Sequence, residues 1–216
     1  MPIFAGQAHP NGPENRPFAE RTIAIQGKTR ICTLTFGHPK PDDIVDWTSN
    51  GHYDATRAHA TMLDLTYEYR GHFWQGVFGS VVLSMRTNVR KPDSPPWNDL
   101  QSILEGVRIQ RLAHNRATKN NHPDGRQEWL EPILSKLNGI PCIKQYVYWG
   151  NDPKGEWLYY FPIDEDHVLE LSIWLVDNGN RPGLTQSDWR PRAEAFANHL
   201  LSTVRVSVEA ITPHPY

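Results

Sequence analysis

Within residues 61–70, TMLDLTYEYR, apolar and polar side chains alternate over the eight positions 63–70, and this run constrains the fold most. The apolar side consists of Leu63, Leu65, Tyr67 and Tyr69. A period of two residues over this length is typical of a β-strand with one buried face. Gly71 and His72 can turn the chain, and residues 73–89 then read as a longer returning strand. The chain must therefore build a sheet that packs one face on an apolar core.

Other segments also read as strands joined by short turns. Residues 21–26 and 30–37 are rich in β-formers and are separated by a short break that contains Gly27 and Lys28, which predicts a hairpin. The last third holds three more runs, 140–150, 156–163 and 167–176, and their short connections favour an antiparallel meander. The segment TVRVSV, 203–208, reads as a final short strand.

Three segments show helical spacing of apolar residues. The first stripe is Trp97, Leu100, Ile103, Leu104 and Val107, and a polar loop follows it. The second is Trp129, Leu130, Ile133, Leu134 and Leu137, after which Asn138-Gly139 reads as a helix stop. The third is Ala193, Phe196, Ala197, Leu200 and Leu201.

The order of these elements predicts an α+β fold. We expect an antiparallel β-sheet of hairpins and a C-terminal meander, with about three helices packed on one face. Residues 1–20 read as an extended arm, and 21–216 as a single domain. A division into two lobes near 113–125 is the alternative.

Charge and composition bear on the class of function. The 22 basic and 24 acidic residues leave a formal net charge of -2, which disfavours nucleic-acid binding. No apolar run approaches the roughly 20 residues of a membrane span, and the N-terminus does not resemble a secretory signal. We therefore expect a cytoplasmic protein. Its two cysteines, Cys32 and Cys142, are expected to be buried, reduced thiols.

The sequence contains no catalytic motif, and we assign no catalytic, cofactor-binding or metal-binding residue. His52, His59 and His72 lack the spacing of helical or finger-type metal sites. No phosphate-binding glycine loop or nucleophile elbow occurs. A hydrolase with a His/carboxylate site in the 38–72 region is one alternative function. A carrier of a small apolar ligand is another.

Charged and aromatic side chains supply the candidate partner-binding residues. Basic residues gather at Arg108, Arg111, Arg116 and Lys119, and acidic ones at Asp164, Glu165 and Asp166. Such asymmetry can speed association with a charged partner, although a solvated loop and turn would look the same. The strands add Trp149, Trp157 and Tyr159, residue types that interface centres prefer.

The C-terminal third, about 139–208, resembles the closing section of PsbP-like α+β domains. It is also similar to small bacterial immunity proteins that neutralise toxins delivered by type VI secretion. The resemblance lies in the order of strands around WLYYFPID and HVLELSIWLV, then in Trp189, Ala193 and the segment 200–206. It implies a non-enzymatic protein that binds and occludes a toxic effector in the cytosol. Our leading hypothesis is therefore a protein-binding immunity or inhibitor protein, with no cofactor and no membrane or nucleic-acid partner.

Overall fold

The structure is a computed structural model, and it describes most of the chain. The described residues are 12–56, 60–71, 76–90, 94, 96, 97, 99–121, 127–149, 152–177 and 189–211. Within them, the ends of some elements are described for the backbone alone, including 118–121, 149 and 152–154.

The larger of two sheets has eight strands in the described residues. These are β3 (Asp43–Asp46), β5 (Ala60–Arg70), β6 (Val77–Val89), β7 (Gln127–Trp129), β8 (Ile133–Leu137), β9 (Ile140–Trp149), β10 (Asp152–Pro162) and β11 (His167–Asp177). The order is β3-β5-β6-β11-β10-β9, and both β7 and β8 pair with the outer edge of β9. All pairings are antiparallel, so the predicted meander of β9, β10 and β11 is confirmed.

The smaller sheet has the order β12-β2-β1-β4. Its strands are β1 (Phe18–Gln26), β2 (Arg30–Pro39), β4 (His52–Asp54) and β12 (Arg205–Ala210). The predicted hairpin of β1 and β2 is confirmed, and Gly27 N–H closes its turn on the carbonyl oxygen of Arg30 at 2.9 Å. A short 3-10 helix, Pro13–Asn15, precedes β1.

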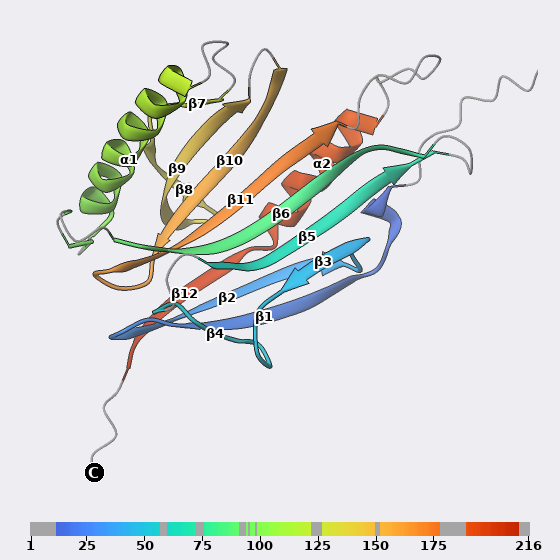
Figure 1. Ribbon diagram of the computed structural model, residues 1–216. Helices are drawn as coiled ribbons and strands as arrows, with labels where there is room; N and C mark the ends of the chain where they lie inside the picture. Colours follow the sequence, from blue (N-terminus) through green and yellow to red (C-terminus); the bar gives the residue numbers. More distant parts are fainter. Residues whose placement is uncertain are drawn as a thin grey trace, which may run out of the picture.

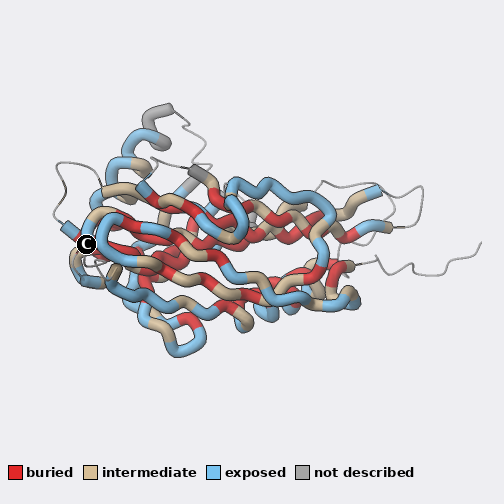
Figure 2. The backbone as a smooth tube through the Cα atoms, turned by 90° about the horizontal axis from the view of Figure 1, so that it is seen from below, coloured by how far each residue is buried: buried red, intermediate tan, exposed pale blue. Residues whose placement is uncertain are grey.

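The main core lies between the two sheets and helix α2 (Trp189–Ser202). The alternating side of β5 is buried, as its sequence pattern predicts. It packs with Ile23 and Leu34 of the smaller sheet and with Phe196 and Leu200 of α2. The buried stripe predicted for this last helix is also confirmed. Figure 2 shows the buried segments gathered between the layers and the exposed ones along the outside.

Helix α1 (Leu100–Asn121) covers part of the opposite face of the large sheet. Its Ile103, Leu104 and Val107, together with Trp97, form a second cluster with β9, β10 and β11. Figure 1 shows α1 and α2 on opposite faces of this sheet. Among the described residues, no helix has both the length and the apolarity needed to cross a lipid bilayer.

The predicted α+β class with about three helices is wrong, because the protein is mostly β. The described residues form twelve strands in two sheets and two α-helices. The second predicted helix, around 129–137, is instead the broken edge formed by β7 and β8. Asn138 and Gly139 have φ of 52° and 83°, the backbone of a tight two-residue hairpin turn between β8 and β9. The same Asn-Gly pair suits a helix stop, which explains the error.

The polar stretch after the first predicted helix is also helical. Helix α1 continues through 113–121, part of the predicted loop, up to Asn121. There the side-chain amide of Asn115 bonds the backbone of β7. It donates to the Trp129 carbonyl at 2.9 Å and accepts from the Trp129 N–H at 3.0 Å. The contacts of this polar segment are therefore made with β7 rather than with solvent alone.

Candidate binding surface beside helix α2

A pocket of about 240 Å³ opens between the strands of the meander and helix α2. Its strand side is formed by Tyr146, Trp157, Ile173 and Leu175, and its helix side includes Arg190, Glu194 and Asn198. Tyr146, Trp157 and Ile173 are register partners on three consecutive strands, so their side chains share one face of the sheet. The strand pairing thus delivers an apolar and aromatic floor.

Aromatic side chains extend this floor beyond the helix. The Tyr146 ring lies 4.4 Å from the Trp157 ring and 5.3 Å from the Tyr148 ring, centroid to centroid. Trp157 is 40% exposed and Tyr148 is 37% exposed, whereas Tyr159, two residues after Trp157 on the same face of β10, is buried. We name Lys144, Tyr146, Tyr148, Trp157 and Tyr159 the aromatic surface.

Two features hold these rings in place. A Cβ on Gly155 would collide with the Tyr146 ring, so the glycine lets that ring lie directly on the backbone of β10. The register between β9 and β10 shifts at this point, between Asp152 and Gly155. On the other side, the Lys144 ammonium lies 3.9 Å from the centroid of the Trp157 ring, a cation–π contact. The exposed tryptophan is therefore ordered before any partner arrives.

The helix side of the pocket is polar. Arg190 pairs with Glu194 one turn later, with 3.2 Å between Nε and Oε1. Such an exposed i,i+4 pair contributes little to stability, but it leaves charged groups at the rim of an apolar floor. An apolar centre with a polar rim is the usual anatomy of a protein interface.

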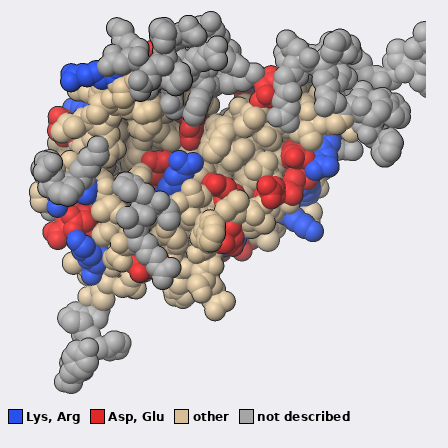
Figure 3. Space-filling view, viewed as in Figure 1, with Lys and Arg blue, Asp and Glu red and all other residues tan. Residues whose placement is uncertain are grey.

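The predicted basic residues lie on α1, away from this pocket. Arg108 and Arg111 both bind the carboxylate of Glu131, each at 2.6 Å. Arg116 is exposed on the same helix, and the side chain of Lys119 lies outside the described residues. On this side of the molecule acidic and basic residues are interspersed rather than gathered by sign (Figure 3).

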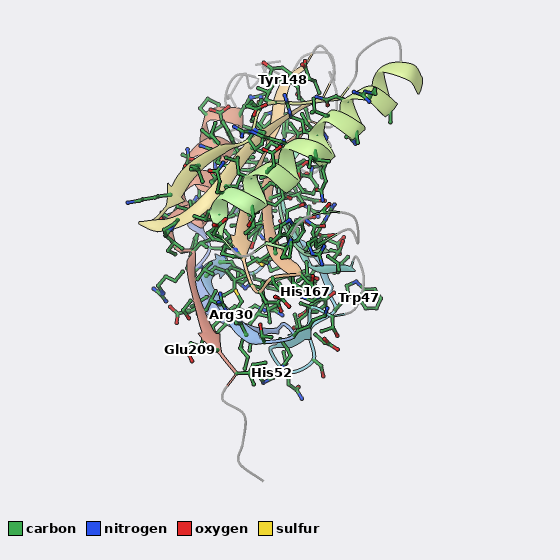
Figure 4. The ribbon with its side chains drawn as sticks, turned by 90° about the vertical axis from the view of Figure 1, so that its left-hand side faces the viewer. Arg30, Trp47, His52, Tyr148, His167 and Glu209 are labelled. Carbon is green, nitrogen blue, oxygen red and sulfur yellow. The ribbon has the colours of Figure 1, made fainter. Side chains whose placement is uncertain are left out.

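The predicted acidic residues have mainly structural contacts. The side chain of Asp164 is 0% exposed. Its carboxylate accepts hydrogen bonds from the backbone N–H of Lys28 at 2.6 Å, of Asp166 at 2.9 Å and of His167 at 2.9 Å. The His167 imidazole adds a fourth, with Nδ1 at 2.7 Å. His167 is buried and is the first residue of β11; Figure 4 labels its position.

The neighbours of Asp164 extend the same network. Asp166 pairs with Lys28 of the β1–β2 turn and with Arg90, whose Nη2 lies 2.8 Å from Asp166 Oδ1. Glu165 is exposed, and its backbone carbonyl accepts a hydrogen bond from the Trp97 N–H at 2.8 Å. The β10–β11 turn thus ties together the two sheets and the approach to α1.

The remaining predicted aromatic residues lie on the meander. Trp157 and Tyr159 belong to the aromatic surface. Trp149 ends β9, and its side chain is outside the described residues. The sequence reasoning missed Lys144 and the helix side of the pocket, because neither carries a local signal.

The residues of the alternative functions lie elsewhere. His52 is exposed on β4 of the smaller sheet, and Figure 4 places it at the opposite end of the molecule from Tyr148. His59 and His72 lie outside the described residues. In the part of the chain that the structure describes, no three metal-ligating side chains gather.

The two cysteines are free and buried, as the sequence predicts. Burial raises the pKa of the Cys32 thiol to about 12 and that of Cys142 to about 11. Both thiols are therefore protonated near neutral pH and are poor nucleophiles.

The other face of the large sheet carries a partly buried acidic residue, Glu170, that the sequence reasoning does not single out. Burial raises the pKa of Glu170 on β11, although Asn88 donates a hydrogen bond to its carboxylate at 2.6 Å. Beside it, the buried Ser84 hydroxyl accepts from Arg86 Nε at 3.3 Å. This polar row lies beyond the apolar contacts of α1, and the pocket does not include it.

A comparison with protein-family models finds no match for this chain, and a comparison with curated proteins finds none either.

Proposed function

We propose that this chain is a protein-binding module, and that an anchor side chain of its partner enters the pocket between α2 and the meander. The observation that carries the proposal is the half-exposed Trp157, held by Lys144 and Tyr146 at the mouth of the pocket. Tryptophan and tyrosine dominate the energetically important centres of protein interfaces. Rings that are ordered in advance bind at a lower entropic cost.

The size of the pocket favours a protein partner over a carried small molecule. Pockets for drug-sized ligands usually measure about 300 to 1,000 Å³. At about 240 Å³ the pocket is smaller, and it suits one large side chain of a partner. The exposed Tyr148 and Trp157 beside it would then contact the partner's surface around that anchor.

The proposal includes an inhibitory role. Residues 139–208, which resemble type VI immunity proteins, supply β9, β10, β11 and α2, the elements that form the surface. We propose that the chain binds and occludes a toxic effector in the cytosol. Two unpaired cysteines are consistent with a reducing compartment.

The test compares two exposed tryptophans. Trp47 is 69% exposed and projects from a different part of the molecule than Tyr148 (Figure 4), so Trp47→Ala is a matched control for Trp157→Ala. Tagged wild-type protein and both variants are incubated with a lysate of the native host at moderate salt. We expect wild type and Trp47→Ala to retain the same stoichiometric partner. Trp157→Ala should retain at least about tenfold less, because interface hot spots contribute roughly 2 kcal/mol or more.

Thermal unfolding of the three proteins accompanies the capture, since an exposed side chain should be removable without unfolding the domain. Equal retention by Trp157→Ala and wild type, in folded proteins, would refute the assignment of the surface. An empty capture by wild type would count against a protein-binding function altogether.

A further inference from the structure

We infer that the partner presents a carboxylate next to its apolar anchor, and that the carboxylate pairs with Lys144. This inference rests on the proposed function, and it specifies the chemistry of the partner. Its starting point is the position of Lys144 between its two register neighbours, Ile133 on β8 and Tyr159 on β10. Lys144 thus lies between the exposed Ile133 and the aromatic residues of β10.

The ammonium group of Lys144 contacts rings rather than an acid. It lies 3.9 Å from the Trp157 centroid and 5.6 Å from the Tyr159 centroid. Among the described residues no carboxylate forms an ion pair with it, whereas Arg190 across the pocket has Glu194. In the free protein, water solvates the exposed part of this half-buried cation.

A partner that covers Trp157 also removes water from the Lys144 ammonium group. Removing water from a charged group without supplying a partner is unfavourable, and it would cancel much of the gain from burying the rings. A carboxylate on the partner would replace this lost water as the counterpart of the Lys144 charge. It would also attract the partner to Lys144 over a longer range. Any partner that binds this surface tightly is therefore expected to be acidic at this point.

The geometry also limits where the acid lies in the partner. Trp157 both contacts Lys144 and lines the pocket, so the carboxylate and the anchor side chain must be neighbours. In an extended segment, side chains two residues apart share a face and are separated by roughly 7 Å. We therefore expect an Asp or Glu within about two residues of a large apolar or aromatic anchor.

Single-stranded nucleic acid is the other ligand class that stacks on aromatic side chains beside a lysine. Such sites combine the rings with a basic groove that follows the phosphates. Here Arg190 and Glu194 at the pocket pair with each other and do not form a basic groove, and the formal net charge of the chain is -2. The surroundings of Lys144 thus favour a protein acid over a phosphate chain.

The test selects binders from a library of random linear peptides on the immobilised full chain, and in parallel on Trp157→Ala. We expect enriched peptides that depend on Trp157 and carry an acidic residue within about two positions of an aromatic or large aliphatic one. The best peptide is then synthesised, together with a form in which its acid is replaced by the amide. Both are titrated against wild type, Lys144→Met and Lys144→Arg.

The expected result is a double-mutant cycle with coupling. Lys144→Met should weaken binding of the acidic peptide about fivefold, and Lys144→Arg should bind it nearly as well as wild type, because arginine keeps both the charge and the stacking. The amide peptide should bind wild type and Lys144→Met with similar affinity. Any loss of packing between residue 144 and the rings would weaken both peptides equally and would cancel in the cycle.

Other outcomes separate this inference from the proposed function. Trp157-dependent peptides that lack an acid, or a cycle without coupling, would overturn the inference and leave the binding surface standing. Failure to enrich any Trp157-dependent peptide would count against both. Tight, Trp157-dependent binding of a fluorescent oligothymidine would overturn the protein acid in favour of nucleic acid.

Discussion

Replacing Asp164 by alanine is expected to lower the free energy of unfolding by about 3 to 5 kcal/mol, the typical cost of removing a buried charged group from its hydrogen-bonding partners. The carboxylate is fully buried and accepts four hydrogen bonds. In the variant, the N–H groups of Lys28, Asp166 and His167 lose their acceptor inside the protein. The adjacent Glu165→Ala is the matched control, because that side chain is exposed, and its effect should stay within about 0.5 kcal/mol.

The effect of Asp164→Ala should also depend on pH. Burial alone would raise the pKa of this carboxyl, but the hydrogen bonds from Asp166, His167 and Lys28 hold it below its usual range. A carboxyl with a lowered folded-state pKa stabilises the protein above its unfolded pKa, about 3.9, and loses that contribution as the pH falls through the folded value. Urea unfolding of wild type and Asp164→Ala should therefore show the full difference at pH 7 and a shrinking one below about pH 4. A difference under about 1 kcal/mol at pH 7 would contradict this assignment.

Trp189→Ala is expected to lower the free energy of unfolding by about 3 to 5 kcal/mol, the range for truncating a large buried aromatic residue. Trp189 begins α2 and is buried. Its ring lies against Gly79 of β6, where a Cβ would collide with it, and 5.7 Å from the Tyr69 ring. The contact fixes the first turn of the helix on the sheet, and this helix forms one wall of the pocket.

Trp157→Ala serves as the comparison for Trp189→Ala in the same unfolding experiment. Its ring is half-exposed, so its removal should cost about 1 kcal/mol or less. Equal losses from the two substitutions would contradict the distinction between a core tryptophan and a binding tryptophan.

The sequence predicts the strands and helices that have a regular spacing of apolar residues and bury only one side. The apolar residues of β5 recur with the two-residue period of a strand, and those of α2 recur with the period of a helix. Each element packs that apolar side on the core. Hairpins with short turns, such as β1–β2, are also legible, because a turn of this length permits only antiparallel neighbours.

The segment 129–137 shows where periodicity fails. Ile133 and Leu134 are adjacent on edge strand β8, point to opposite faces and are both exposed, so their apolarity does not mark a buried side. Their spacing fits a helix by coincidence. The Asn138-Gly139 turn is that of a hairpin, since both residues have positive φ angles and Leu137 pairs with Ile140 across it.

The candidate site could be predicted only in part. Trp157 and Tyr159 stand out as aromatic residues on a strand, but the pocket needs a helix that begins about thirty residues later in the chain. Asp164 looks like a solvated turn residue in sequence, and its burial depends on the distant Lys28 backbone. Long-range contacts of this kind leave no local pattern.

The central claim, that a partner docks on the aromatic surface, is tested most directly by photo-crosslinking from defined positions in the native host. A photoreactive phenylalanine analogue replaces Tyr148 in one variant and Trp47 in another, two exposed positions that lie far apart (Figure 4). We predict that position 148 forms a covalent adduct with the protein that the wild type captures, and that position 47 does not. An adduct from position 47 alone, or the absence of any adduct from position 148, would contradict the proposed binding surface.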